Sequence, residues 1–172
     1  SQNRRGALVV VDFGSDLRPE DFLYSGIDIE AQLSTELLIN LFATDTPLHD
    51  GAVLVKGNKI ISAGVILPLS RQGISRYGTR HLAALGISER FDRCICIVVS
   101  EETGTLSLAH QGKLERPITS SRLQELLIDF IGNPNNQNSS KSSTNRNVTS
   151  PKNVTTDIIP NIVIDKTINK TD

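Results

Sequence analysis

The feature that most constrains the fold is a continuous apolar run near the start of the chain, residues 7–13 (ALVVVDF), which Gly14 and Ser15 close. Such a β-branched run, without polar alternation, is typical of a central strand that is buried on both faces. Residues 94–100 (CICIVVS) form a second buried strand. A sheet built on such strands needs apolar cover on both sides. The sequence therefore predicts an α/β domain with a mixed, mostly buried central sheet flanked by helices.

The two cysteines of the chain, Cys94 and Cys96, alternate within that second run. The period-two geometry of a strand puts both sulfurs on one face. A C-x-C pair without further cysteines is a poor signal for zinc or for a disulfide. We therefore interpret Cys94 and Cys96 as reduced thiols in the core, which is typical of a reducing compartment.

The other predicted elements follow from helical spacing, caps and turn residues. The first is a helix that Ser34 caps and that ends near Thr44, and it is followed by a type II′ hairpin at Gly57-Asn58 between strands 52–55 and 60–67. A second helix begins at Thr79, and a strand over 105–109 pairs as a hairpin with strand 94–100. The last helix runs from about residue 120 to Ile131. Residues 14–33 are interpreted as polar sequence that Pro19 and Gly26 interrupt.

The composition changes at residue 133, where asparagine, serine, threonine and lysine with scattered isoleucines replace the periodic pattern. Such a segment cannot bury enough apolar surface to offset its ordering entropy. We therefore expect one folded domain over residues 1–132 and a low-complexity, disordered tail over 133–172. The run 158–164 leaves a transient strand or docking segment as the alternative.

The formal net charge of −1 excludes a global field that would recruit nucleic acid or anionic lipid. No apolar run approaches the roughly 20 residues of a membrane span, and no signal-peptide pattern opens the chain. We expect a piece that contacts neither nucleic acid nor membrane. Because the chain lacks any methionine, we interpret it as a fragment, and the full-length protein is compatible with upstream membrane spans. A cytoplasmic location is the default, and an organelle of bacterial descent is equally compatible.

Residues 46–52 (TPLHDGA) combine a histidine, a carboxylate and a glycine at the mouth of an apolar strand. Pro47 prevents helix continuation, so the chain turns sharply there. Residues 78–81 (GTRH) open a helix; with Thr79 as N-cap, the backbone amides of Arg80 and His81 would be unpaired and would form an anion seat. An acidic turn and a basic helix start together suit a metal-nucleotide.

Each of these motifs also has a purely structural interpretation. An Asp-Gly pair is usually a turn, and the pattern alone favours a structural Asp50. His81 could be a helix-cap residue, and Glu101 with Glu102 could be a solvated hairpin turn.

At these residues the chain resembles the diadenylate cyclase family, in particular the catalytic domain of its membrane-anchored bacterial members. The resemblance covers about residues 6–130. It rests on four blocks in family order, which are residues 46–52, 78–81, 86–89 (GISE) and 100–104 (SEETG). It implies that two ATP molecules are condensed into cyclic di-AMP, with release of two pyrophosphates, at the interface of a facing homodimer.

The resemblance also implies residue roles. Asp50 would promote attack of the ribose 3′-hydroxyl on the α-phosphate of the other ATP, with Arg80 and His81 completing the catalytic set. His49 and Glu101 would hold the divalent metal, although Glu102 is a close alternative to Glu101. The implied substrate-binding residues are Gly51, Ala52, Leu67 against the adenine, Gly78, Thr79, Arg80, His81 and Ser100. One imidazole with carboxylate and phosphate oxygens suits Mn²⁺ or Mg²⁺ better than zinc.

The chain departs from the family pattern at two positions. Leu82 stands where the family commonly has a second arginine, and Ile66 stands where some members carry an aromatic residue that stacks on the base. The loss of a cation from the phosphate site leaves a catalytically weak or inactive adenine-nucleotide sensor of the same fold as the alternative function. A third interpretation is an inert scaffold whose tail carries the function.

Overall fold

The structure is a computed structural model, and it describes residues 5–132 of the chain. The predicted tail over residues 133–172, with its run 158–164, lies outside the described residues.

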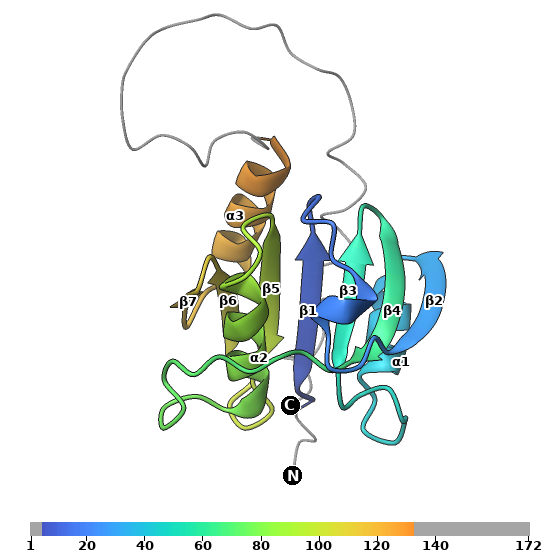
Figure 1. Cartoon of the computed structure of the whole chain (residues 1–172), viewed down its shortest axis with the longest axis horizontal. Coiled ribbons are helices and arrows are strands. Elements are labelled where there is room, and N and C mark those ends of the chain that lie inside the picture. The colour runs from blue at the N-terminus through green and yellow to red at the C-terminus, as the bar shows by residue number, and fades with distance from the viewer. Residues whose placement is uncertain (1–4, 133–172) are drawn as a thin grey trace, which may run out of the picture.

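The described residues form a seven-stranded mixed sheet with the order β2-β4-β3-β1-β5-β6-β7 and helices on its two faces (Figure 1). The elements are β1 (Ala7–Asp12), the 3-10 helix η1 (Pro19–Asp21), β2 (Ile27–Gln32), α1 (Thr35–Leu41), β3 (Ala52–Lys56), β4 (Lys59–Val65), α2 (Thr79–Ser88), β5 (Cys94–Val99), β6 (Leu106–His110), β7 (Lys113–Glu115) and α3 (Ser120–Gly132). The predicted α/β class with a mixed sheet is confirmed.

Strand β1 is the centre of the sheet, as its β-branched run predicts. It pairs in parallel with β3 and antiparallel with β5. Val10 and Val11 project to opposite faces, and each is almost fully buried. One face packs against α1 and α3, and the other packs against α2. The apolar run therefore fixes both the central strand and the need for helices on two sides.

The predicted caps and hairpins are found where the sequence places them. The Ser34 side chain accepts a hydrogen bond from the backbone N–H of Leu37 at 3.2 Å and so caps α1. Gly57 has φ +60° while Asn58 keeps an ordinary negative φ, which fits the type II′ turn between β3 and β4. Cys94 and Cys96 are free, fully buried thiols on the α2 side of the sheet, and burial raises the pKa of the Cys96 thiol.

Two edge strands were not predicted. Strand β2 lies in the segment interpreted as interrupted polar sequence, and that interpretation was wrong because β2 pairs antiparallel with β4. Its pairing shifts register between Asp28 and Ala31, and Glu30 has φ +48°, so the strand lacks clean alternation. Strand β7 follows the turn at Gln111 and Gly112 and spans three residues.

Among residues 5–132, the structure contains no helix with the length and apolarity that a membrane crossing requires.

Candidate functional site

One end of the central strands, which we call the edge below, brings together the sequence blocks that were singled out. The registers of β1 with β3 and with β5, continued beyond the strand ends, place Gly6 between Asp50 and Ser100. The start of β3, the start of β1 and the end of β5 therefore meet at one edge, which is the lower edge in Figure 1, and α2 begins there as well. Because neighbouring strands lie about 4.8 Å apart, the backbones at Asp50 and Ser100 are separated by about 10 Å.

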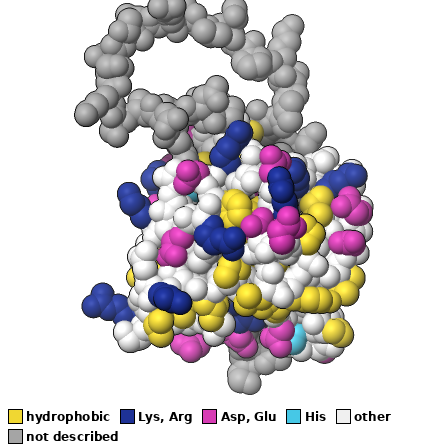
Figure 2. All heavy atoms as spheres, viewed as in Figure 1, with side chains coloured by type: hydrophobic (Ala, Val, Ile, Leu, Met, Phe, Trp, Pro, Cys, Tyr) yellow, Lys and Arg dark blue, Asp and Glu magenta, His cyan; other side chains and the backbone are white. Residues whose placement is uncertain are grey.

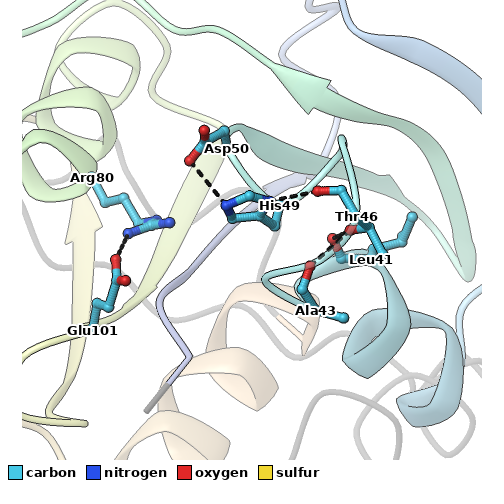
Figure 3. Close-up of polar contacts among 7 residues, drawn as sticks. All are labelled: Leu41, Ala43, Thr46, His49, Asp50, Arg80 and Glu101. Carbon is cyan, nitrogen blue, oxygen red and sulfur yellow. Dashed lines mark hydrogen bonds and ion pairs between the residues drawn. The ribbon is translucent and has the colours of Figure 1, made fainter. Parts of the chain in front are cut away.

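His49 and Asp50 form the first pair at this edge (Figure 3). His49 Nε2 lies 3.4 Å from Asp50 Oδ1, and the Asp50 side chain is 82% exposed. His49 Nδ1 lies 2.5 Å from the carbonyl oxygen of Thr46. A carbonyl oxygen can only accept, so Nδ1 carries the hydrogen. In the neutral ring, Nε2 then has a free lone pair that faces a carboxylate oxygen.

This tautomer meets a condition for metal binding. A histidine that ligates through Nε2 usually donates its Nδ1–H to a backbone carbonyl or a carboxylate, which orients the ring. Two acceptors, Nε2 and Oδ1, face each other at 3.4 Å, and a cation or a proton between them removes their mutual repulsion. An imidazole nitrogen together with carboxylate oxygens is a donor set that fits a divalent metal such as Mn²⁺ or Mg²⁺. Within the described residues, no group of three or more His, Cys, Asp and Glu side chains could hold a metal, so a substrate would have to supply further ligands.

The turn that carries this pair is held from both sides. The Thr46 hydroxyl donates to the carbonyl of Ala43 at 2.8 Å, which ties the turn to the end of α1. A Cβ on Gly51 would lie 2.4 Å from the carbonyl carbon of Gly64, so the two backbones pass too closely for a side chain. Ala52 is buried. Gly51 therefore serves close packing of β3 on β4, and this packing fixes the direction in which Asp50 points.

Arg80 and Glu101 form the second pair. Arg80 Nη1 lies 2.8 Å from Glu101 Oε2, with side-chain exposures of 25% and 57%. In Figure 3 the guanidinium points toward the side on which Asp50 and His49 lie. Ser100 holds the turn that carries Glu101, because its hydroxyl accepts from the Thr103 N–H at 3.3 Å. A cation from α2 thus reaches the edge that the carboxylates occupy.

The start of α2 differs from the prediction by one residue. The N-cap is Gly78, which has extended backbone angles, and the helix begins at Thr79. The His81 N–H donates to the Gly78 carbonyl at 3.0 Å, so the prediction of an unpaired amide at His81 was wrong. Among the described residues, the amides of Thr79 and Arg80 have no backbone acceptor. The anion seat of the helix start is therefore made by those two residues.

The His81 side chain faces the interior. It is 8% exposed, its Nε2 lies 3.1 Å from the hydroxyl of Ser107 on β6, and its ring stacks on Tyr77. Burial, with a smaller contribution from the charge of Arg116, lowers the pKa of His81, so the ring is neutral at neutral pH. The predicted contact of this side chain with phosphates does not fit that placement, because the ring lies between α2 and β6.

Leu67 also has a different position from the one expected. Its side chain is 3% exposed and packs in the core between the sheet and α2, so it offers a base little surface. Its neighbours Ile66 and Leu69 are exposed by 39% and 51%. Figure 2 shows hydrophobic side chains in a band across the lower part of the visible face. Ile66 directly follows β4, whose end pairs with the start of β3, so Ile66 supplies exposed apolar surface beside this edge.

Leu82 and the block 86–89 have packing roles. Leu82 is 7% exposed, and its carbonyl accepts from the Ser70 N–H at 2.9 Å. The Ser70 hydroxyl donates to Glu89 Oε1 at 2.5 Å. A Cβ on Gly86 would lie 2.1 Å from the Pro68 carbonyl oxygen. This block therefore clamps the segment after β4 onto α2.

Sequence reasoning missed Gly6. Gly6 lies in the middle of the edge between Asp50 and Ser100, and the signal that could have found it is a glycine directly before a buried strand. Asp12, the last residue of β1, has a structural role. It is buried, accepts from the N–H groups of Gly14 and Ser15 at 2.9 and 2.6 Å, and lies 3.6 Å from Lys56 Nζ. Asp12 therefore stabilises the turn after β1.

A hollow of about 440 Å³ lies between the loop over residues 72–77, α2 and the β6–β7 turn. Its lining residues are Gln72, Gly73, Ser75, Arg76, Tyr77, Leu85, Gly112 and Leu114. None of the predicted site residues lines it, so it is separate from the edge where the two pairs meet.

Comparison with known proteins identifies a family model and several relatives that match this chain. The sequence model of the family described as DisA bacterial checkpoint controller nucleotide-binding (DAC) matches residues 1–114. A diadenylate cyclase of Listeria monocytogenes is 48% identical over 130 residues, which cover 74% of this chain and 46% of that protein. The cyclic di-AMP synthase CdaA of Bacillus subtilis is 46% identical over 129 residues, with the same coverage. The chain thus spans about half the length of these relatives.

Solved structures resemble the fold as well. A double mutant of DacA from Staphylococcus aureus superposes with a TM-score of 0.67 at 42% identity, over 74% of this chain and 84% of that one. A hypothetical membrane spanning protein from Bacillus cereus gives a TM-score of 0.61 at 43% identity, over 67% of this chain and 56% of that one.

Proposed function

The chain belongs to the DAC family, described as DisA bacterial checkpoint controller nucleotide-binding, and on that premise we propose that it is a diadenylate cyclase, which joins two ATP into cyclic di-AMP and releases two pyrophosphates. The observation that carries this proposal is the meeting of two pairs at one sheet edge. His49 with Asp50 and Arg80 with Glu101 are far apart in sequence and are brought together by β3, β1 and β5.

The reaction depends more on the positioning of the 3′-hydroxyl and the α-phosphate than on a strong nucleophile. In each of two steps a ribose 3′-oxygen forms a bond to the α-phosphorus of the other ATP, and the bond from that phosphorus to the bridging oxygen breaks. Pyrophosphate leaves with the electron pair. The Asp50 carboxylate accepts a hydrogen bond from the 3′-hydroxyl, orients it and takes its proton. Asp50 is suited to this role because it is 82% exposed at the mouth of a rigid strand.

The developing phosphate charge meets cations and backbone amides from α2. Arg80 supplies a guanidinium, and the amides of Thr79 and Arg80, which follow the N-cap Gly78, supply the anion seat at the helix start. Among the predicted substrate residues, Gly51, Ala52 and Ser100 then act through backbone placement, and His81 supports α2 from within. We assign the adenine to the exposed apolar surface of Ile66 and Leu69 that flanks Leu67.

A divalent metal, Mn²⁺ or Mg²⁺, would be held by His49 Nε2 and a carboxylate together with phosphate oxygens. When bound it would neutralise charge on the phosphates. We favour Glu101 over Glu102 as the carboxylate from the β5–β6 turn, since Glu101 already faces Arg80. The tautomer that the Thr46 carbonyl selects supports His49 as a ligand.

Two copies of the chain are needed, because one site presents one ATP and the product contains two. We therefore propose a facing homodimer, in which the exposed edge of each copy meets the other. Specific activity per protomer should fall on dilution through the dimer dissociation constant. A rate proportional to protein concentration over several decades, from a protein that stays monomeric by light scattering, would exclude the facing dimer.

We also propose a cytosol-facing location, since the cytosol supplies ATP. The likeness to a Bacillus cereus protein described as membrane spanning supports anchoring of a longer chain. Fractionation of the full-length protein would test this, and recovery only in the soluble fraction would contradict anchoring.

The deciding experiment incubates the protein with ATP and Mn²⁺ or Mg²⁺ and detects cyclic di-AMP by mass spectrometry. Asp50→Asn should fold normally, because the side chain is exposed, and should lose product by about 10²- to 10⁴-fold, as expected for loss of a proton acceptor. Asp129→Asn, an exposed aspartate on α3, is the matched control and should keep full activity. Equal activity of Asp50→Asn and Asp129→Asn would refute the role of Asp50.

The sensor alternative has one observation in its favour, which is Leu82 at the position of a family arginine. It predicts nucleotide binding without cyclic product in the same experiment.

A further inference from the structure

Gly6 lies directly before β1, is buried, and has the guanidinium of Arg80 over its α-carbon. A Cβ placed on Gly6 would lie 2.5 Å from Arg80 Nη1, 2.8 Å from Arg80 Cζ and 3.0 Å from the Cβ of Glu101. Real Cβ atoms do not approach other heavy atoms within 3.0 Å. The guanidinium therefore occupies volume that the side chain of any other residue would fill.

Backbone conformation does not explain the glycine. Gly14 and Gly26 have φ values of +106° and +78°, where other residues are strained. Gly6 has no such positive φ, so its φ does not require glycine. A glycine beside a strand also weakens the strand, since it offers no side chain to pack. The remaining reason for glycine at position 6 is the space above its α-carbon.

That space lies at the middle of the proposed site. The registers of β1 with β3 and β5, continued beyond the strand ends, place Gly6 between Asp50, in the turn that precedes β3, and Ser100, which follows β5. Arg80 comes from α2 and Glu101 from the β5–β6 turn, and their 2.8 Å ion pair spans the start of β1. A side chain at position 6 would lift the guanidinium away from this edge.

We propose that Gly6 is a positioning residue, which seats the Arg80 guanidinium against the start of β1 so that it points at the edge occupied by Asp50. The packing of the Arg80 guanidinium on Gly6, called the guanidinium seat below, is a property of the fold. Its consequence for nucleotide binding rests on the proposed function.

The test is a double-mutant cycle with wild type, Gly6→Ala, Arg80→Ala and the double variant. The probe is 3′-deoxyadenosine triphosphate with Mg²⁺, which lacks the attacking hydroxyl, so affinity is measured by calorimetry without turnover. Gly6→Ala should weaken binding by about tenfold or more, because a charge-assisted hydrogen bond contributes about 1.5–3 kcal/mol. In the Arg80→Ala background the same change should have no further effect, because no guanidinium is left to displace.

Gly132→Ala is the matched control. Among the described residues, a Cβ at Gly132 would meet no atom within 4 Å, and this variant should bind the probe like wild type. Wild-type affinity of Gly6→Ala, or an equal loss on Gly6→Ala in both backgrounds, would overturn the proposal.

Thermal unfolding of the same four proteins without nucleotide separates this proposal from the proposed function. If the guanidinium packs on Gly6, then Gly6→Ala lowers the melting temperature more in the wild-type background than in the Arg80→Ala background, which has no guanidinium to displace. If Gly6→Ala alone fails to fold, Arg80→Ala should restore a folded protein, and failure to restore it would overturn the guanidinium seat. If the wild type neither binds the probe nor makes cyclic product, the proposed function fails, while the unfolding data still decide the guanidinium seat.

Discussion

Replacement of Gly86 by alanine should destabilise the domain strongly, although alanine is the better helix former. Gly86 is in the middle of α2 and is buried. An added Cβ would lie 2.1 Å from the Pro68 carbonyl oxygen and 2.8 Å from the Ser70 nitrogen. Both are backbone atoms, so no side-chain rotation relieves the contact. The segment after β4 would have to move away from α2.

The magnitude follows from what that movement breaks. The Ser70 N–H would lose the Leu82 carbonyl, and the Ser70 hydroxyl would lose Glu89. Each bond contributes about 1 kcal/mol, and overpacking adds about 1–3 kcal/mol. The higher helix propensity of alanine returns about 1 kcal/mol. The net loss is about 2–4 kcal/mol, which lowers the melting temperature by roughly 8–16 °C at about 4 °C per kcal/mol.

Differential scanning calorimetry of Gly86→Ala checks this value, beside Gly132→Ala as the control whose added Cβ meets no atom of residues 5–132 within 4 Å. Nucleotide affinity should fall as well, because the segment that moves follows Ile66 and Leu67. A Gly86→Ala protein that melts with the wild type, or above it, would refute the close packing of this segment on α2.

Two further predictions concern Leu82 and the tail. Leu82→Arg places a charge at a position that is 7% exposed, where an unpaired charge is costly, so it should lower the melting temperature by several degrees without tightening ATP binding; wild-type stability with tighter binding would contradict this. Ending the chain at Gly132 keeps every helix and strand described here and should leave melting temperature and activity unchanged; a fall of several degrees would mean that residues 133–172 contribute to the fold.

The central part of the fold could be predicted from sequence because burial on both faces leaves a continuous β-branched signature. The run at Val9, Val10 and Val11 has it, and the alternation of Cys94 with Cys96 sets one face of β5. Edge strands have no such signature. In β2 the register shift beside Glu30 interrupts the alternation, and β2 is identified by its pairing with β4. Pairing is a long-range property, which a local pattern does not contain.

The sequence predicted which motifs form the candidate site, but it did not predict the direction of each side chain within them. In an α-helix successive residues differ in direction by about 100°, so motif neighbours diverge in space. Arg80 reaches the sheet edge and Glu101, while His81 turns to Ser107 on β6. Since α2 is buried from His81 to Ser88, its sequence has no polar face that would indicate this division.

The Arg80–Glu101 pair joins the residue predicted to meet phosphate with the residue predicted to meet metal. This ion pair is consistent with both roles if separating it costs little free energy. Glu101 is 57% exposed, and ion pairs at such positions contribute about 0–1 kcal/mol. A guanidinium–phosphate hydrogen bond contributes about 1.5–3 kcal/mol, and a metal would take over the carboxylate. The free energy that a metal-nucleotide gains from binding the two groups is therefore larger than the free energy lost when the ion pair separates. Without a metal-nucleotide, Glu101 compensates the charge of the Arg80 guanidinium at the start of β1.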